Sequence, residues 1–329
     1  MSGISTSCQG VVRRIRRYGT IGAWMLLCCA VPATPGLYAR PAPVAEAATS
    51  LLSRAVPQEV IAVCFIGEKT TRAEPQAVRS ALSLVALLAD QARAMGLLAH
   101  AGTGTRLWID AAAALSVVLD HPVAAVLLDV RSRPREDGGH ELAEMKAALI
   151  VLTGGAHRPI ERRIQHLLST YTNSEETTLS TRSLDDTVVT TIQDRRLPAW
   201  ALIEAAPLGD YFVISIGKGA LTSIVAAMHG RTGSLATDDW AAAAMSPSRS
   251  VRHGLTLYAR LDRLLERVDR RLAGKIRSAQ VPLGMAGTQR LCWSVGSRGR
   301  SVESTLVLRR HDRDRIRTVA GAALADRQL

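Results

Sequence analysis

Aromatic residues are scarce in this 329-residue chain. Phe, Trp and Tyr together make up 4% of the residues, whereas hydrophobic residues make up 47%, so the core must be built mainly from Leu, Val, Ile and Ala. Proteins that bind single-stranded nucleic acid need aromatic side chains beside basic ones, and no stretch of this sequence combines the two. The composition predicts a folded domain with an aliphatic core and no nucleic-acid partner.

Lysine is also rare. Only four of the 41 basic residues are lysine, and the others are arginine. Removal of four arginines with an N-terminal signal would lower the net charge from +12 to +8. The arginines of 260–277 and 309–317 are interleaved with Asp and Glu, which is typical of solvated faces. Weak contact between these Arg-rich segments and an anionic lipid surface is the alternative interpretation.

The recognised catalytic patterns are missing. The sequence has no G-x-S-x-G nucleophile elbow and no H-E-x-x-H zinc motif. It predicts no catalytic residue, no cofactor-binding residue and no metal ligand, and the absence of a reaction motif favours a protein that is not an enzyme.

The N-terminus carries the most specific feature, an export signal. Four arginines within residues 13–17 precede the uncharged apolar run 21–31, which Pro32 ends; this order is typical of a bacterial secretory signal peptide. The run is about half of the roughly 20 residues that a spanning helix needs. We expect residues 1–33 to be a cleaved signal peptide and the mature protein to be periplasmic or extracellular, with no transmembrane span. An uncleaved N-terminal membrane anchor is the alternative.

Five cysteines are present, and three of them precede the expected cleavage site. Cys64 and Cys292 remain, each in an apolar, strand-like run. In an oxidising compartment they could be bridged if their strands are neighbours, but two buried free thiols are the simpler expectation.

The hydrophobic pattern predicts an α+β fold with mostly antiparallel sheet and packed helices. Residues 34–50 are rich in Pro and Ala and are expected to form a disordered lead-in. A first α+β unit is expected over 51–200 and a second over 201–329, which ends in a β-hairpin and a basic tail.

Strands are expected at 59–66, 123–130, 147–152, within 172–200, at 202–217 as a hairpin, at 253–261 and at 290–309 as a hairpin turning at 296–299. Helices are expected at 75–98, 110–119, over a short stretch before 147, from 159, at 221–228, at 238–245 and from 261, with Leu264, Leu265, Val268 and Leu272 of the last helix facing inward.

An internal repeat connects the two expected units. AAAALS at 111–116 and AAAAMS at 241–246 each follow a strand ending in Ile-Gly and a helix, and each precedes a strand ending in Leu-Asp. The repeated order predicts two similar βααβ-containing units that share a sheet or pack side by side. Chance recurrence of Ala-rich helices explains the same pattern equally well.

Gly217-Lys218-Gly219 is a candidate phosphate-binding turn between a strand and a helix. The glycine spacing and hydroxyl of a complete phosphate loop are absent, so a tight connecting turn is the favoured interpretation. Gly102-Thr103-Gly104 is a weaker candidate because no strand leads directly into it.

Two groups of polar residues that include histidine are candidate sites. Asp137, His140 and Glu141 share a Gly-Gly loop in which acid/base chemistry is conceivable. His157, Glu161 and His166 lie near one helix start, but their spacing does not place all three on one face, so exposed helix residues are favoured over metal ligands.

One long segment is similar to a known group of proteins. The run YFVISIGKGALTSIVAAMHGRTGSLATDDWAAA, followed by HGLTLYARLD and WSVGSRGRSVESTLVL, resembles exported bacterial families of unknown function from planctomycete-type bacteria. The likeness covers about residues 205–310 and brings no catalytic residues with it. It implies an uncharacterised or non-enzymatic envelope protein.

Together these features predict an exported envelope protein that acts as an interaction or structural module, with a protein or envelope component as partner. The alternative is a periplasmic hydrolase or a phosphate-ligand-binding enzyme that uses Gly217-Lys218-Gly219 or the His140 loop. An enzyme would gather Lys218, His140 or His157 with acids in one pocket.

Overall fold

The structure is a computed structural model, and it describes the larger part of the chain after residue 43. The described residues are 44–66, 118, 121–134, 136, 140–171, 176–195, 197–245, 252–282, 285–298, 301–310 and 319–320. The expected signal peptide, the helix at 75–98 and most of the helix at 110–119 lie outside these residues. None of the described helices is both long and apolar enough to cross a membrane.

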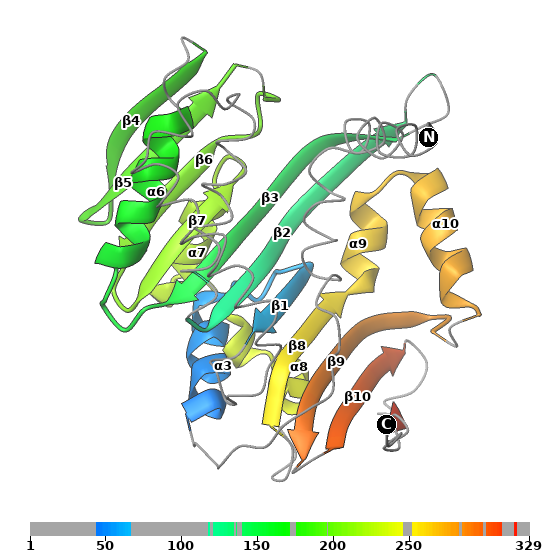
Figure 1. Cartoon of the computed structure of the whole chain (residues 1–329). Helices are drawn as coiled ribbons and strands as arrows, with labels where there is room; N and C mark the ends of the chain where they lie inside the picture. The colour runs from blue at the N-terminus through cyan, green and yellow to red at the C-terminus, as the bar shows by residue number, and fades with distance from the viewer. Residues whose placement is uncertain are drawn as a thin grey trace, which may run out of the picture. The chain divides into compact units, whose positions relative to one another are not determined.

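One 11-stranded sheet forms the framework, in the order β11-β10-β9-β8-β1-β2-β3-β7-β6-β5-β4 (Figure 1). All its strand pairs are antiparallel, which confirms the predicted α+β class. The strands are β1 Ala62–Ile66, β2 Val123–Pro134, β3 His140–Leu152, β4 Thr177–Leu184, β5 Thr187–Asp194, β6 Ile203–Leu208, β7 Tyr211–Ile216, β8 Arg252–Arg260, β9 Thr288–Arg298, β10 Ser301–Arg310 and β11 Val319–Ala320.

The described helices lie over both faces of this sheet. They are α3 Val44–Ala55, α6 Arg158–Tyr171, α7 Ala220–Met228, the short 3-10 helix η2 Leu235–Thr237, α8 Asp239–Met245, α9 Leu261–Arg267 and α10 Arg270–Gln280. Because successive side chains of a strand point to opposite faces, the strand register assigns each strand residue to one face or the other.

We call one side of the sheet the α7 face. Phe65, Ala124, Ile150 and Val213 follow one another across β1, β2, β3 and β7 in register on this face. They are buried in one cluster with side chains of α3, α7, η2 and α8. This cluster is the main core, and it is aliphatic as the composition predicts.

We call the opposite side the α6 face. Ile160 of α6 is buried there with Val123, Val151 and Phe212, which are in register on β2, β3 and β7. Buried residues therefore lie on both faces of the central strands, which explains why their sequences read as continuous apolar runs.

The β2–β3 hairpin is longer than predicted. Residues 131–134 continue β2, and residues 141–146, for which a short helix is expected, belong to β3. Glu, Leu, Ala and Met favour helix, but cross-strand pairing overrides that preference. Arg133 Nη2 lies 2.7 Å from Glu141 Oε1, and Arg131 Nε lies 3.8 Å from Glu144 Oε2, in each case across the two strands.

The expected disordered lead-in is wrong for its last residues. Residues 44–50 form the start of α3, where Ala48 is buried, and Leu52 and Ala55 follow it into the core. The spacing of Ala48, Leu52 and Ala55 puts them on one side of the helix. The Pro/Ala-rich composition of 34–50 did not indicate this apolar side of a helix.

The charged segment from 261 forms two helices rather than the single helix predicted. Val268 has an extended backbone, and the side chain of Asp269 accepts hydrogen bonds from the N–H groups of Arg271 and Leu272, which begins α10 with an N-cap. Ser132 of β2 donates to Asp269 Oδ2 at 2.8 Å. The residues expected to face inward are partly buried, because the short α9 covers only a small area of the sheet.

The two expected units share the sheet, since β1 pairs with β8 and β3 pairs with β7. The predicted equivalence of residues 59–130 and 211–262 is wrong in its strand pairing. β1 and β2 are direct neighbours, whereas three strands separate β7 from β8. The repeated order of elements therefore does not correspond to two equivalent folding units.

Cys64 and Cys292 are buried free thiols. They belong to β1 and β9, which β8 separates. Cys64 is in register with Leu257, and Cys292 with the adjacent Tyr258, so the two thiols point to opposite faces. A disulfide requires close Cβ atoms on one side of the backbone, which this arrangement excludes.

The turn between β7 and α7 requires glycine at its first position. Gly217 has φ +101°, and a Cβ atom at this residue would lie 2.1 Å from the carbonyl oxygen of Met145 on the neighbouring strand β3. Gly219 also has a positive φ and caps α7. Lys218 between them is exposed. The structure thus explains the two glycines by backbone geometry.

Replacing Gly217 should consequently destabilise the protein far more than replacing Lys218. We expect Gly217→Ala to lower the free energy of unfolding by about 2 kcal/mol or more, because of left-handed strain and the close carbonyl. We expect Lys218→Ala to change it by less than about 0.5 kcal/mol. Urea unfolding of both variants measures this difference, and equal losses would contradict the assignment.

Candidate functional site

The β4–β5 hairpin forms one end of the sheet (Figure 1). β4 pairs with β5 along all eight of its residues, and no described strand pairs with its other side. Six consecutive residues of β4 are exposed. The outer side of β4, here called the β4 edge, therefore presents backbone donors and acceptors that lack a described strand partner.

A two-residue turn holds the hairpin together. Asp185 and Asp186 have φ of 47° and 63°, as in a type I′ turn, whose twist suits a tight hairpin. Asp185 is tied to the end of α7, because Arg231 donates to its carboxylate and His229 Nδ1 lies 3.4 Å from its Oδ2. The hydrogen bond from Arg231 lowers the pKa of Asp185, so this tether is ionised at neutral pH.

The middle of β4 is anchored by a charged hydrogen bond to a buried acid. Arg182 donates to Glu204 Oε1 from Nε at 3.0 Å and from Nη2 at 2.7 Å. Glu204 is 1% exposed, and its other oxygen has no hydrogen-bond partner among the described residues. Arg182 thus compensates a buried carboxylate on β6.

The far end of the hairpin is joined as well. The side chain of Thr177 donates to the buried Asp194 at 3.4 Å, and the backbone N–H of Arg195 donates to the carbonyl of Glu176 at 2.9 Å. β4 is therefore fixed at both ends and in its middle, so its outer edge is held in an extended conformation.

Two apolar side chains stand exposed on one face of this hairpin. Leu179 is 49% exposed and Val188 is 65% exposed. The register, in which Leu179 opposes Ile192 and Ser183 opposes Val188, places both on the same side of the sheet. The sequence predicted exposed Thr-rich strands in this region, but it did not indicate that one of them ends the sheet.

The candidate catalytic residues from the sequence analysis lie apart from one another in the structure. Lys218 follows Ile216, which pairs with Ala147 in the middle of β3, whereas β3 begins at His140. His157 follows the other end of β3, about 40 Å from His140 at about 3.4 Å per strand residue. Asp137 lies outside the described residues. Lys218, His140 and His157 therefore do not form one pocket.

His157 takes part in a local structural contact. Its Nδ1 lies 2.7 Å from Thr153 Oγ1, and its Nε2 lies 2.8 Å from the carbonyl oxygen of Gly209. These bonds join the start of α6 to the β6–β7 turn. Glu161 donates its backbone N–H to the carbonyl of His157 in the first turn of the helix. Among the described residues, no group of His, Cys, Asp and Glu has metal-binding geometry.

A spacing that the sequence analysis overlooked is Ser215-x-x-Lys218, which some serine hydrolases use. Ser215 is buried on β7, whereas Lys218 is exposed in the turn beyond it. Ser215 Oγ has no hydrogen-bond partner among the described residues, so the spacing is not accompanied by the nucleophile–base contact that this chemistry needs.

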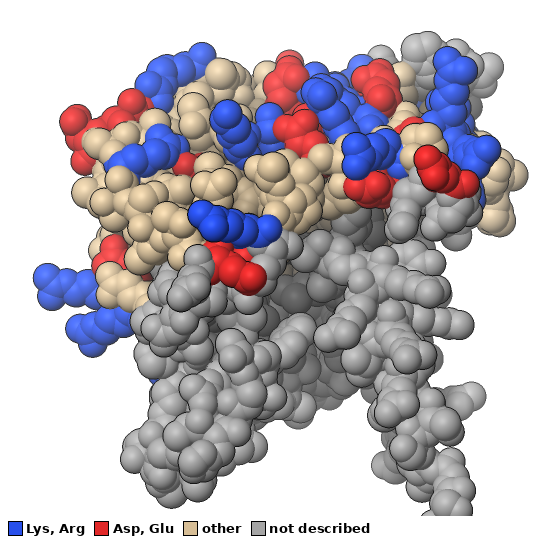
Figure 2. Space-filling view, turned by 90° about the horizontal axis from the view of Figure 1, so that it is seen from above, with Lys and Arg blue, Asp and Glu red and all other residues tan. Residues whose placement is uncertain are grey.

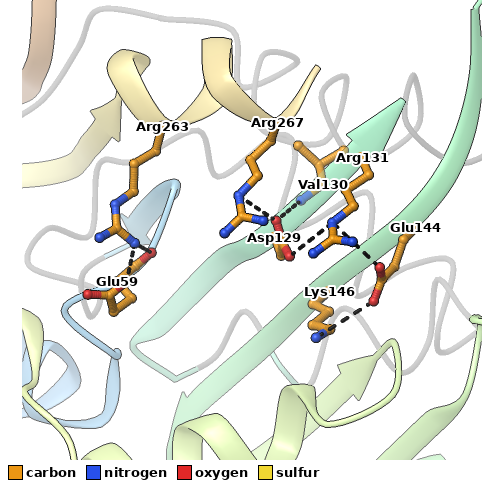
Figure 3. A network of polar contacts seen from close by, with 8 residues as sticks. All are labelled: Glu59, Asp129, Val130, Arg131, Glu144, Lys146, Arg263 and Arg267. Atoms are coloured by element: carbon orange, nitrogen blue, oxygen red, sulfur yellow. Dashed lines mark hydrogen bonds and ion pairs between the residues drawn. The ribbon is translucent and has the colours of Figure 1, made fainter. Parts of the chain in front are cut away.

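The arginines of α9 pair with Asp129 of β2 and with Glu59, which precedes β1 (Figure 3). Arg267 Nε lies 3.5 Å from Asp129 Oδ1, Arg131 Nε lies 3.9 Å from Asp129 Oδ2, and Arg263 donates to Glu59. In the view of Figure 2, Lys and Arg are interspersed with Asp and Glu. The basic residues of α9 therefore join the helix to the sheet, as expected of a face with acidic neighbours.

The following helix α10 has a different charge pattern. Its basic residues are exposed and form no ion pair with the described acidic residues; they are Arg270, Arg271, Lys275 and Arg277. Contact of this helix with an anionic surface stays a prediction.

Loss of Arg182 should destabilise the protein because it leaves Glu204 buried without its partner. We expect Arg182→Met to lower the free energy of unfolding by about 2 kcal/mol. Arg133 is a matched control, since it also lies 2.7 Å from a glutamate, but its partner Glu141 is exposed. Arg133→Met should change the stability little, because exposed ion pairs contribute little. Urea unfolding at pH 7 compares the two, and similar losses would refute the role of Arg182.

Comparison with known proteins gives little further information. No protein-family model and no curated protein matches the chain. The solved structure named "Structure of crystal form I of TP0453" is similar over 79% of this chain and 79% of that chain, with 9% sequence identity and a TM-score of 0.35. A TM-score this low supports no inference about fold or function.

Proposed function

We propose that the protein is an exported envelope protein that acts as a non-enzymatic interaction module, and that its β4 edge binds an extended strand of a protein partner. The observation that carries this proposal is the eight-residue strand β4, which is paired on one side only and exposed along most of its length. Strand addition to such an edge gives affinity through backbone hydrogen bonds and specificity through alternate side chains.

The composition of β4 favours pairing. Edge strands that avoid association carry proline, lysine or inward-pointing charges, and β4 has none of these apart from Arg182. Arg182 is already bound to Glu204. Leu179 and Val188 add exposed apolar area on one face, where a partner side chain could pack.

The turn geometry indicates which amides of β4 point outward. In a two-residue hairpin the residues that flank the turn, Leu184 and Thr187, exchange hydrogen bonds, and every second residue of β4 then does the same. Thr178, Ser180 and Arg182 therefore pair with β5. Leu179 and Thr181 direct their N–H groups to the outer side.

The enzymatic alternative has less support. It requires Lys218 or the His140 loop to meet acids or a nucleophile in one pocket, and the described positions of Lys218, His140 and His157 are separate. The resemblance of 205–310 to exported families of unknown function agrees with an envelope role.

Thr181→Pro should weaken partner binding because it removes an outward N–H. With a photo-crosslinking residue at position 179, expressed in native cells, we expect one protein adduct whose crosslinked peptide is an extended segment. The adduct should fall roughly fivefold in Thr181→Pro, since one backbone hydrogen bond contributes about 1 kcal/mol. Thr181→Val, which keeps the amide, should retain it.

The same crosslinker at Thr222, an exposed position of α7, controls for contacts unrelated to the edge. Adducts at 222 identical to those at 179, no adduct at 179, or equal adducts in Thr181→Pro and Thr181→Val would each contradict strand addition at the β4 edge.

Export predicts a new N-terminus in the native protein. Small residues at Ala45 and Ala47 would also permit cleavage after Ala47. Cleavage after Ala33 leaves α3 complete, whereas cleavage after Ala47 would remove the helix residues before the buried Ala48. We therefore expect mass spectrometry of the protein from envelope fractions to find Thr34 as the first residue. An intact Met1 on cytosolic protein would contradict export.

A further inference from the structure

The exposed surface of α10 carries four basic side chains and no acidic one. They are Arg270, Arg271, Lys275 and Arg277, here called the α10 cations. Ala273 and Gln280 are buried, and because they are seven residues apart they lie on one side of the helix. The helix is therefore attached to the protein along that side and presents its positive charge to solvent.

The α10 cations differ from the basic residues of α9, whose charge is offset. Arg267 pairs with Asp129, and Arg263 pairs with Glu59. The sequence of α10 contains no Asp or Glu. The carboxylate of Asp269, which precedes the helix, already accepts hydrogen bonds from two backbone N–H groups and from a hydroxyl of β2. Among the described residues, the charge of α10 is therefore left without an anionic partner.

Helix stability does not explain this composition. Arg270 and Arg271 lie in the first turn, where the positive end of the helix dipole disfavours cations. Arg271 and Lys275 are four residues apart, so their like charges repel each other. Gly274 lowers the helix propensity relative to alanine, although a Cβ atom at this position would meet no atom of the described residues within 4 Å. An external anion would make this unfavourable arrangement of charge favourable.

An exposed apolar side chain lies beside these cations. Val281 is 64% exposed and has helical backbone angles. It follows Arg277 by four residues, so the two side chains are neighbours on the helix surface. Pro282, which comes next, is also exposed. Basic side chains together with an apolar side chain suit the surface of a bilayer, where phosphate groups lie above the acyl chains.

We propose that α10 binds the surface of an anionic phospholipid bilayer through the α10 cations and Val281. The cations lie at the lipid phosphates in this arrangement, and Val281 enters the boundary between headgroups and acyl chains. A nucleic acid offers the same phosphate charge, but α10 has no aromatic side chain that could stack on bases. Ser132 joins α10 to β2, and four strands lie between β2 and β4, so a bilayer and a strand partner of the β4 edge do not compete for one surface.

Co-sedimentation of the purified mature chain with vesicles tests the proposal. We expect binding to vesicles that contain phosphatidylglycerol, weaker binding as salt is raised, and no binding to vesicles of phosphatidylcholine alone. Arg271→Gln combined with Lys275→Gln should weaken binding about fivefold for each cation removed, and so roughly 25-fold in total. The matched control is Arg158→Gln combined with Arg162→Gln, which removes the same charge from exposed positions four residues apart on α6 and should change binding by less than about twofold.

A fluorescent label gives a second, independent readout. Cys64 and Cys292 are buried, so a thiol-reactive, polarity-sensitive dye attaches mainly to the new thiol of Val281→Cys. Its emission should rise and shift to shorter wavelength on phosphatidylglycerol vesicles, because the dye enters a less polar environment. The same dye on Thr222→Cys, at an exposed position of α7, should not respond.

Three results would overturn the proposal. They are equal binding to neutral and anionic vesicles, equal losses of binding in the two double variants, and unchanged emission of the dye at position 281. Binding of DNA but not of vesicles by the unmodified chain would assign the α10 cations to a nucleic acid and would also overturn it.

Discussion

Antiparallel pairing between strands that are far apart in the sequence is the constraint on which the structure depends. β1 pairs with β2 on one side and with β8 on the other, and β3 pairs with both β2 and β7. These pairings place apolar side chains in register on both faces of the central strands. The core, the turns and the candidate sites all occupy positions that this register sets, since a shift by one residue would exchange the two faces.

Polar groups within the sheet depend on the same register. Glu204 is buried on the α7 face and is compensated by Arg182 from β4, which connects the interior to the edge strand. Arg290 and Asp238 form a second pair at the other half of the sheet. Removing one partner of a buried pair leaves an uncompensated charge. These two contacts therefore fix where the edge strand and α8 lie. The packing of the aliphatic core has no preferred direction and does not fix these positions by itself.

Local patterns predicted the elements that carry their own signals. The hairpin predicted at 202–217 is the β6–β7 hairpin with Gly209 at its turn, and the helix predicted at 221–228 is α7, which Gly230 with φ 68° follows. The helix predicted from 159 is α6. Prediction was wrong at residues 141–146 and at Val268, because a cross-strand partner and the cap formed by Asp269 decide the conformation there. The first error arises from pairing with another strand, whereas the cap at Asp269 is a local signal that the helical periodicity does not reveal.

The sequence by itself determined the α+β class, the aliphatic core and the tight strand-to-helix turn at 217–219. The tertiary structure alone decided that Leu179 lies on an edge strand, that Cys64 and Cys292 point to opposite faces, and that Arg260 of β8 stands opposite Arg290 of β9. The physical reason is that propensity and periodicity act over a few residues, whereas strand order and register arise from pairing between segments as far apart as β1 and β8.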